Sequence, residues 1–183
     1  MDSKYYLKKI NEDYPRRADI TPLFEDSNVF RNLIKDLVMA FKKTKIDRVV
    51  ALDSLGFILG APVAYELKKP LIIIRKEGKL PQNKKDLNRV SFENGIRLKG
   101  IKRKDLPKRA LEIKKSSIKK GDKILIVDEW IEVGTQMKAA IKLVEKLGGK
   151  VVGIATIKCE RSKTTDVLFE KYNCKSIIVK NEA

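Results

Sequence analysis

The chain of 183 residues has a length typical of one domain with a full core, and its 43% hydrophobic and 36% charged residues are typical of a globular protein. It contains no histidine, which excludes Ser-His-Asp hydrolysis, histidine-ligated metal sites and acid–base chemistry by an imidazole ring. The net charge of +17 favours an anionic partner, namely a phosphorylated metabolite, nucleic acid or an acidic surface.

Residues 1–17 predict a short N-terminal helix that ends at Pro15. This segment has no apolar region of the kind found in signal peptides, and no apolar run in the chain reaches the length of a membrane span. The two cysteines, Cys159 and Cys174, form no CxxC pair, which suggests a reducing compartment. We therefore expect a cytoplasmic protein without a membrane partner.

The following residues predict helices and strands in alternation. Residues 19–23 predict an extended or turning segment because the residue before a proline avoids the helical region, and Asp26-Ser27 predicts the cap of the next helix, whose apolar stripe reaches Phe41. The pattern then predicts a strand over 46–53, a tight turn over 54–56, a helix from about residue 60 to 67, and a second strand over 71–74. Strand, helix and strand in this order imply a right-handed parallel crossover.

Residues 75–94 are polar and basic and show no apolar period, so we expect a mobile functional loop that acts as a lid over an anionic substrate. Short strands are expected at 97–98 and 110–113, on either side of an insert at 99–108. Residues 97–123 contain 12 Lys or Arg against three acids, which suits either a solvated lysine-rich face or a nucleic-acid patch. The segment has no aromatic residue that could stack on bases, which weakens the second interpretation.

Residues 123–148 hold the most informative pattern. The apolar run 124–127 predicts a buried parallel strand, the acids Asp128 and Glu129 follow directly, and a turn over 132–136 leads into a helix over 135–147. A ligand beyond the end of such a strand would meet backbone N–H groups and a helix N-terminus, which favour a phosphate. Acids also follow core strands in proteins with no ligand there, so the pattern alone leaves both interpretations open. After this helix we expect strands over 151–157 and 176–179, with a short helix over 164–172 between them.

Five motifs occur in one order along residues 20–150: Asp19-Ile20-Thr21-Pro22-Leu23, Asp53-Ser54-x-Gly56-Phe57-Ile58-Leu59-Gly60-Ala61-Pro62, Arg75-Lys76-x-Gly78-Lys79-Leu80-Pro81, Glu93-x-Gly95 and Ile124-Leu125-Ile126-Val127-Asp128-Glu129. Together they resemble the type I phosphoribosyltransferases, and most closely the adenine-specific branch of that family. The resemblance implies a single domain over 1–183 with a Rossmann-like, open, mainly parallel α/β sheet flanked by helices and a mobile loop or hood. Within it, residues 1–22 would form a base-side segment, 75–96 a mobile catalytic loop and 97–122 a basic insert.

The resemblance also implies an activity. Such pentosyltransferases use Mg²⁺ and phosphoribosyl pyrophosphate (PRPP) to convert a free purine base, here with adenine favoured, into a nucleoside monophosphate and pyrophosphate, in purine salvage. Glu93 would handle the proton at purine N7, and the backbone near Arg16, Arg17 and Ala18 would read the base edge. The PRPP site would comprise Ser54, Leu55, Arg75, Lys76, Lys79, Asp128, Glu129, Glu132, Val133, Gly134, Thr135 and Gln136. The metal would arrive with PRPP, near Asp128, and a homodimer is expected whose loops complete each other's sites.

The chain departs from the family pattern at three places. Leu55 stands where an arginine is usual, Ala18 stands where an arginine precedes Asp19, and Glu132-Val133-Gly134-Thr135-Gln136 replaces Ala-Thr-Gly-Gly-Thr. Three interpretations therefore remain open. The chain is an active purine phosphoribosyltransferase, which is favoured, or a regulator that senses PRPP or a nucleotide and binds nucleic acid, or an enzyme acting on another base or a related acceptor.

Overall fold

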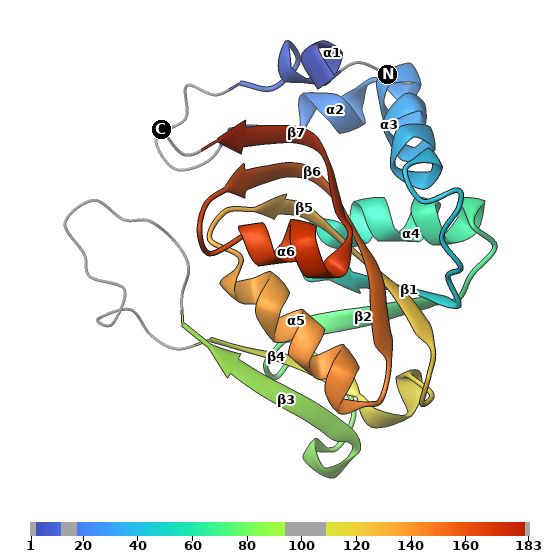
Figure 1. Ribbon diagram of the computed structural model, residues 1–183. Helices are drawn as coiled ribbons and strands as arrows, with labels where there is room; N and C mark the ends of the chain where they lie inside the picture. Colours follow the sequence, from blue (N-terminus) through green and yellow to red (C-terminus); the bar gives the residue numbers. More distant parts are fainter. Residues whose placement is uncertain (1–2, 12–17, 94–108, 182–183) are drawn as a thin grey trace.

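The computed structural model describes residues 3–11, 18–93 and 109–181. Within these residues seven strands form one sheet in the order β3-β4-β2-β1-β5-β6-β7 (Figure 1). The strands are β1 Arg48–Leu52, β2 Leu71–Lys76, β3 Leu87–Phe92, β4 Arg109–Lys114, β5 Lys123–Ile131, β6 Lys150–Arg161 and β7 Cys174–Asn181. Strands β2, β1, β5, β6 and β7 pair in parallel, while β3 and β4 pair antiparallel, so the expected open and mainly parallel sheet is confirmed.

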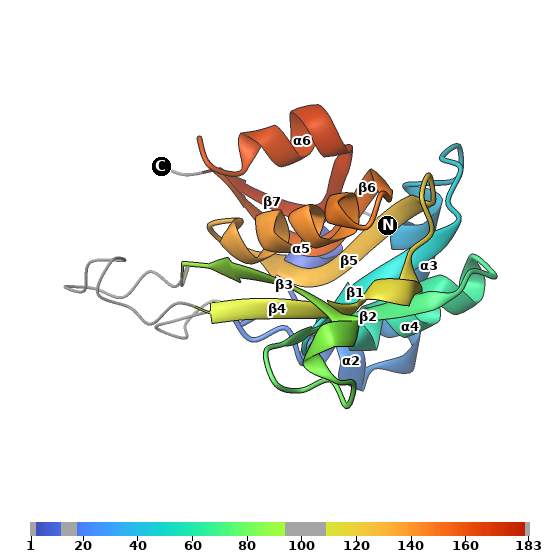
Figure 2. The same cartoon turned by 90° about the horizontal axis from the view of Figure 1, so that it is seen from below.

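Helices cover both faces of the sheet. They are α1 Ser3–Leu7, α2 Pro22–Glu25, α3 Ser27–Met39, α4 Gly56–Glu66, α5 Thr135–Lys146 and α6 Asp166–Tyr172, with short 3-10 turns at Lys84–Asp86 and Lys115–Ser117. Figure 2 shows α5 and α6 on one face and α2, α3 and α4 on the other. None of the described helices is long and apolar enough to cross a membrane.

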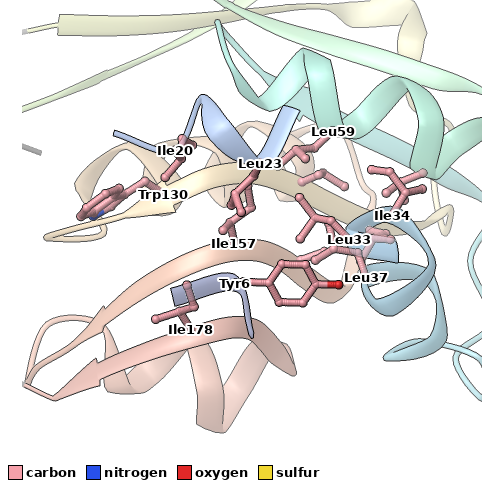
Figure 3. Packing of buried hydrophobic residues seen from close by; sticks show 14 of the residues in the cluster. Tyr6, Ile20, Leu23, Leu33, Ile34, Leu37, Leu59, Trp130, Ile157 and Ile178 are labelled. Atoms are coloured by element: carbon pink, nitrogen blue, oxygen red, sulfur yellow. The ribbon is translucent and has the colours of Figure 1, made fainter. Parts of the chain in front are cut away.

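Each face of the sheet has its own hydrophobic cluster, because successive residues of a strand point to opposite sides. Val49 and Leu125 belong to the cluster under α1 to α4 (Figure 3), whereas Val50 and Ile124 belong to the cluster under α5 and α6. All four side chains are fully buried. The continuous apolar runs of β1 and β5 thus follow from burial on both faces, as the sequence predicts.

Several predicted elements are confirmed with shifted ends. Asp26 is the N-cap of α3, and its Oδ1 accepts hydrogen bonds from the N–H groups of Asn28 and Val29 at 2.8 and 3.1 Å. Helix α4 begins at Gly56, four residues before the expected start. Its Gly60 lies against Ala51, which lets the helix rest closely on β1. Strands β6 and β7 are longer than predicted, and residues 97–98 lie outside the described part of the chain.

The segment over residues 75–94, expected to be a mobile loop, contains regular structure at both ends of its described part. Arg75 and Lys76 complete β2, and Leu87–Phe92 forms the edge strand β3, which pairs with β4 over six residues and packs against α5. Val90 and Phe92 of β3 pack against the cluster under α5 and alternate with the exposed Arg89 and Ser91. Two apolar residues form too short an alternation to be recognised in the sequence. Its place in the sheet depends on the distant partner β4.

The strand that carries the acid pair is also longer than expected. β5 continues through Asp128 and Glu129 to Ile131, because β6 keeps pairing beside it, with Asp128 opposite Thr156 and Ile131 opposite Cys159. The acids therefore lie within the last part of the strand rather than after it. The turn is correspondingly short, and α5 begins at Thr135 as predicted.

Candidate functional site

The candidate site lies where the strand order reverses. From β1 the chain crosses to β2 on one side, whereas from β5 it crosses to β6 on the other, and β1 and β5 are parallel neighbours. Ligands of open α/β sheets bind beyond the carboxyl ends of the strands at such a switch point. The structure thus brings two predicted segments together: the turn after β1, with Ser54 and Leu55, and the end of β5, with Asp128 and Glu129.

Asp128 occupies the centre of this junction. Its side chain is only 3% exposed, and its Oδ1 accepts a hydrogen bond from the Glu129 N–H at 3.0 Å. A Cβ on Gly56 would lie 2.9 Å from the same oxygen, so only glycine allows the start of α4 to approach the carboxylate. Gln136 Nε2 lies 3.5 Å from the other oxygen, Oδ2. The carboxylate is therefore held by the backbone of Glu129 and lies between the starts of α4 and α5.

Gly134 shapes the turn that follows. It has a φ of +77°, the left-handed conformation that glycine adopts without strain, and it is the N-cap of α5 with no side-chain cap. The N-cap residue therefore offers no side-chain acceptor to the first N–H groups of α5. N–H groups of this kind at the start of a helix can donate to a bound anion. Thr135 and Gln136 form the first turn of the helix and are half-buried, as is Glu132 before them.

Val133 contributes to the site only through its backbone. Its side chain is 3% exposed, and its carbonyl oxygen accepts a hydrogen bond from Thr164 Oγ1 at 3.2 Å. The neighbouring Thr165 is fully buried and donates to the Glu160 carbonyl at 2.7 Å. Thr164 and Thr165 thus support the turn from behind, a role that sequence reasoning missed. The three hydroxyl residues Ser162, Thr164 and Thr165, which favour local hydrogen bonds from side chain to backbone, were the available signal.

The turn after β1 carries a buried acid to which the sequence interpretation assigned no role. Asp53 is 4% exposed and forms an ion pair with Arg75 at the end of β2, with 3.2 Å between Arg75 Nε and Asp53 Oδ2. Lys76 Nζ lies 3.9 Å from Asp53 Oδ1. The Asp53–Ser54 peptide bond is cis. Ser54 is exposed, whereas Leu55 is half-buried and packs against the cluster under α1 to α4, so this turn offers a ligand backbone groups and one hydroxyl.

Lys79 lies in the turn that follows β2. Arg75 Nη1 donates a hydrogen bond to the Lys79 carbonyl oxygen at 3.0 Å, so one guanidinium joins this turn to Asp53. The three predicted cations Arg75, Lys76 and Lys79 are therefore grouped around the ends of β2 and β1. All three keep exposed or half-exposed side chains, which leaves them accessible to an anion.

The remaining predicted residues lie at the borders of the site. Glu93 is exposed and directly follows β3, whose carboxyl end lies on the same side of the molecule as the start of α5 (Figures 1 and 2). Ala18 is half-buried and packs against the cluster that contains Trp130. Arg16 and Arg17 lie outside the described residues.

An aromatic residue and a lysine next to the acids were not singled out in the sequence. Trp130, two residues after Asp128, is 8% exposed and lies beside Ile20 of the N-terminal segment (Figure 3). Lys158, its register partner on β6, is 2% exposed, with Nζ 4.5 Å from the centre of the indole ring. Attraction between the ammonium and the ring face offsets part of the cost of burying this charge.

Within the described part of the chain, no group of three or more carboxylates and cysteines is placed to hold a metal ion by itself. Asp128 lies at the junction, and one of its oxygens already accepts a hydrogen bond from a backbone N–H. The donors present therefore fit a Mg²⁺ that is held mainly by a polyphosphate ligand, because this ion keeps waters and takes only one or two carboxylates in such sites.

Comparison with known proteins gives a consistent result. A family model, described as a phosphoribosyl transferase domain, matches residues 24–183. The chain is 42% identical over 137 residues to an adenine phosphoribosyltransferase of Caldicellulosiruptor saccharolyticus, covering 75% of this chain and 71% of that protein. It is 35% identical over 183 residues to the Thermotoga neapolitana enzyme of the same name, covering 98% and 99%. The crystal structure of adenine phosphoribosyltransferase from Thermoanaerobacter pseudethanolicus superposes with a TM-score of 0.83 at 29% identity, covering 97% and 99%.

Proposed function

The chain belongs to the phosphoribosyltransferase family, and we propose that it transfers the 5-phosphoribosyl group of PRPP to adenine, giving adenosine monophosphate and pyrophosphate. The observation that carries the proposal is the meeting of Asp128 and the glycine turn of α5 with the Ser54–Gly56 turn, at the switch point of the sheet. A sugar phosphate with a pyrophosphate group requires this pairing of hydroxyl acceptors with two phosphate-binding turns. The regulatory alternative has gained no support.

The proposal assigns a role to each part of the site. Asp128 and Glu129 hold the ribose hydroxyls, and the backbone of residues 132–136 holds the 5′-phosphate at the start of α5. The turn at Ser54 and Leu55, with the cations Arg75, Lys76 and Lys79, receives the pyrophosphate. Glu93 faces the base N7, and the segment that includes Arg16, Arg17 and Ala18 reads the base edge.

These groups act on the reaction mainly through charge and position. As the bond between the sugar and pyrophosphate breaks, positive charge develops on the sugar and negative charge on the leaving group. Three cations near the leaving group stabilise the second charge, and the carboxylate of Asp128 lies near the first. Mg²⁺, which PRPP would bring to the site, neutralises part of the pyrophosphate charge. The site also lowers the barrier by proximity, because it holds the base and the sugar in line for the reaction.

A panel of bases tests the proposed function. Wild-type protein, PRPP and Mg²⁺ are incubated with adenine, hypoxanthine, guanine or xanthine, and pyrophosphate release is measured. We expect release with adenine, and a loss of about a hundredfold or more in kcat for Glu93→Ala, as for other acid–base groups. Glu170→Ala, an exposed acid on α6, is the control and should behave as wild type. If no base reacts, the enzyme assignment is wrong; if Glu93→Ala matches wild type, the role of Glu93 is wrong.

The expected homodimer is proposed through the face formed by α4 and β2. Four large apolar side chains are exposed there: Ile58 at 41%, Tyr65 at 82%, Leu71 at 39% and Ile73 at 40%. Beside them lies a groove of about 450 Å³ lined in part by Leu80 and Pro81, which follow Lys79. An exposed apolar patch of this kind suits the self-complementary interface of a two-fold dimer, and a partner there would lie next to the proposed pyrophosphate turn.

A cytoplasmic location stays a prediction.

Light scattering after gel filtration tests this interface. Wild-type protein should elute with twice the chain mass, and Ile73→Lys with Tyr65→Lys should convert it to a monomer, because two buried charges per protomer would oppose association. Met39→Lys is the control, because Met39 is also apolar and exposed but lies on α3, away from this face. It should leave the mass unchanged. A monomeric wild type would contradict the dimer, and a doubly substituted dimer would contradict this face.

A further inference from the structure

The turn after β2 is tied to the sheet at each of its three residues. Glu77 accepts a hydrogen bond from Arg89, Gly78 donates its N–H to Glu112, and Lys79 accepts from Arg75, at 2.8, 2.9 and 3.0 Å respectively. In addition, the Glu77 N–H donates to the Ala110 carbonyl oxygen at 3.0 Å. The position of Lys79 is thus set by contacts on three neighbouring strands.

The hydrogen bond between Gly78 and Glu112 is more deeply buried than the ion pair between Glu77 and Arg89. Glu112 is 7% exposed, whereas the side chains of Arg89 and Glu77 are 51% and 50% exposed. Water and salt screen the exposed ion pair, which therefore constrains the turn weakly. A hydrogen bond to a buried carboxylate is charge-assisted and is not exposed to this competition. Of these two ties, the one from Glu112 is the stronger constraint on the turn.

The register explains why Glu112 reaches the turn. It lies opposite Arg75 on β2 and opposite Arg89 on β3, so the three side chains form a row across one face of the sheet. Its neighbours Leu111 and Ile113 point the other way, into the cluster under α5. A buried carboxylate is costly unless it is hydrogen-bonded, and next to an anion site it also opposes the ligand. Its presence is accounted for by the hydrogen bond that it accepts from Gly78.

We propose that Glu112 is a positioning residue for the pyrophosphate end of the site, acting through the Gly78 N–H to hold Lys79 in place. The inference rests on the proposed function, because it takes the Arg75–Lys79 region as the part that binds pyrophosphate. Gly78 has a φ of +77° and nothing within 4 Å of a Cβ, so no side chain packs on the turn at this residue. The turn also has one local backbone hydrogen bond, from the Lys79 N–H to the Lys76 carbonyl oxygen at 3.2 Å. Glu112 supplies the restraint from β4.

Three substitutions at Glu112 separate its possible contributions. Glu112→Met keeps the length and removes the strong acceptor, Glu112→Gln keeps an acceptor oxygen without the charge, and Glu112→Asp keeps the charge with a shorter reach. Arg89→Gln, which removes only the exposed tie, is the matched control. Each variant is measured for pyrophosphate binding with Mg²⁺ by calorimetry, for KM of PRPP and kcat with adenine, and for its melting temperature.

We expect Glu112→Met to raise both the Kd of pyrophosphate and the KM of PRPP about tenfold, the equivalent of one hydrogen bond, while kcat changes less than about twofold. Glu112→Gln should restore both constants to within about twofold, and Arg89→Gln should leave them unchanged. Wild-type affinity in the Met variant would overturn the proposal, and so would a Gln variant as weak as Met. If the Met variant does not fold, the Asp variant decides: a Kd like that of wild type overturns the proposal, and a raised Kd supports it.

Calorimetry also separates this inference from the proposed function. A wild type that binds pyrophosphate but converts no base contradicts the transferase assignment. The Kd of pyrophosphate in the Glu112 variants then still tests the role of Glu112. A wild type that converts adenine, with variants that bind pyrophosphate normally, contradicts only the role of Glu112. A wild type that binds no pyrophosphate contradicts both.

Discussion

Gly134 is the residue on which the proposed phosphate turn depends. Its φ of +77° would cost an alanine about 1 kcal/mol, and a Cβ there would also meet Thr165 Cγ2 at 3.2 Å. We expect Gly134→Ala to shift the turn and raise the KM of PRPP by about tenfold to a hundredfold, because small displacements of a binding group have effects of this size. Steady-state kinetics with varied PRPP measures the change.

Gly121 provides the matched control for this substitution. It has a φ of +88° in a turn at the opposite end of β5, with nothing within 4 Å of a Cβ. Gly121→Ala should lower the free energy of unfolding by a similar amount, about 1 kcal/mol, and leave the KM of PRPP unchanged. Equal kinetics in the two alanine variants would mean that the turn at Gly134 does not bind the phosphate.

At the scale of a single element, α3 depends on its N-cap for part of its stability. Two hydrogen bonds, from the N–H groups of Val29 and Asn28, lower the pKa of Asp26 below its ordinary value of 3.8. A carboxyl with a lowered pKa in the folded state stabilises the fold above its unfolded pKa and loses this contribution as the pH falls through the folded pKa. The melting temperature should therefore fall below a pH of about 4 in part because of Asp26.

Asp26→Asn separates this contribution from that of the other carboxylates. Asparagine caps a helix nearly as well but does not titrate in the acid range, so the variant should resemble wild type at the lowest pH and show a shallower decline. Circular dichroism melts between about pH 2 and 7 give the comparison. Parallel declines for the two proteins would exclude Asp26 as a source of the acid sensitivity.

Helix α4 depends on a different contact, its close approach to β1. A Cβ on Gly60 would lie 2.4 Å from the Cβ of Ala51, too close without a shift of the helix. Although alanine favours helices more than glycine does, we expect Gly60→Ala to destabilise the fold by about 1–3 kcal/mol, the usual cost of overpacking. Urea denaturation is measured for Gly60→Ala, for Ala51→Gly and for the double variant. The double variant should recover part of the stability that Gly60→Ala loses. A neutral or stabilising Gly60→Ala would contradict the close approach.

The same elements show what local sequence can predict. The apolar runs of β1 and β5 can be recognised in the sequence because burial on both faces leaves a continuous apolar pattern. The acid pair and the glycine turn mark the end of β5 at which we propose that a phosphate binds. The edge strand β3 cannot be recognised in the sequence, because polar residues such as Asn88 and Ser91 are held in a strand by pairing with β4. For the same reason the extension of β5 past Val127 follows from pairing with β6 and not from the residues of β5 itself.

The candidate site was predictable to a similar degree. Gly134, Asp128 and the cations Arg75 and Lys76 could be found from motifs, since each motif is local. The buried contacts that hold them could not be found, because Asp53 meets Arg75, and Glu112 meets Gly78, only after the sheet has formed. A single acid in a basic segment has no local feature that distinguishes a buried tether from a solvated charge.

For the whole molecule, the net charge of +17 raises the question of nucleic acid. The described part of the basic segment does not gather on one surface: Arg109 begins β4 near the ligand end of the sheet, whereas Lys119 and Lys120 precede β5 at the opposite end. Strand β4 alone separates these ends by about 17 Å. Separated cations attract a polyanion without forming a specific groove.

We therefore expect only weak and unspecific binding of duplex DNA. Fluorescence anisotropy of a labelled duplex should show binding at about 50 mM salt that disappears by about 200 mM, the behaviour of phosphate contacts alone. PRPP should compete to the same small extent in wild type and in Gly134→Ala, because the competition would occur at scattered surface cations and not through the phosphate turn. Binding that survives near physiological salt, and that responds to PRPP in wild type but not in Gly134→Ala, would instead connect nucleic acid to the phosphoribosyl site and revive a regulatory role for this chain.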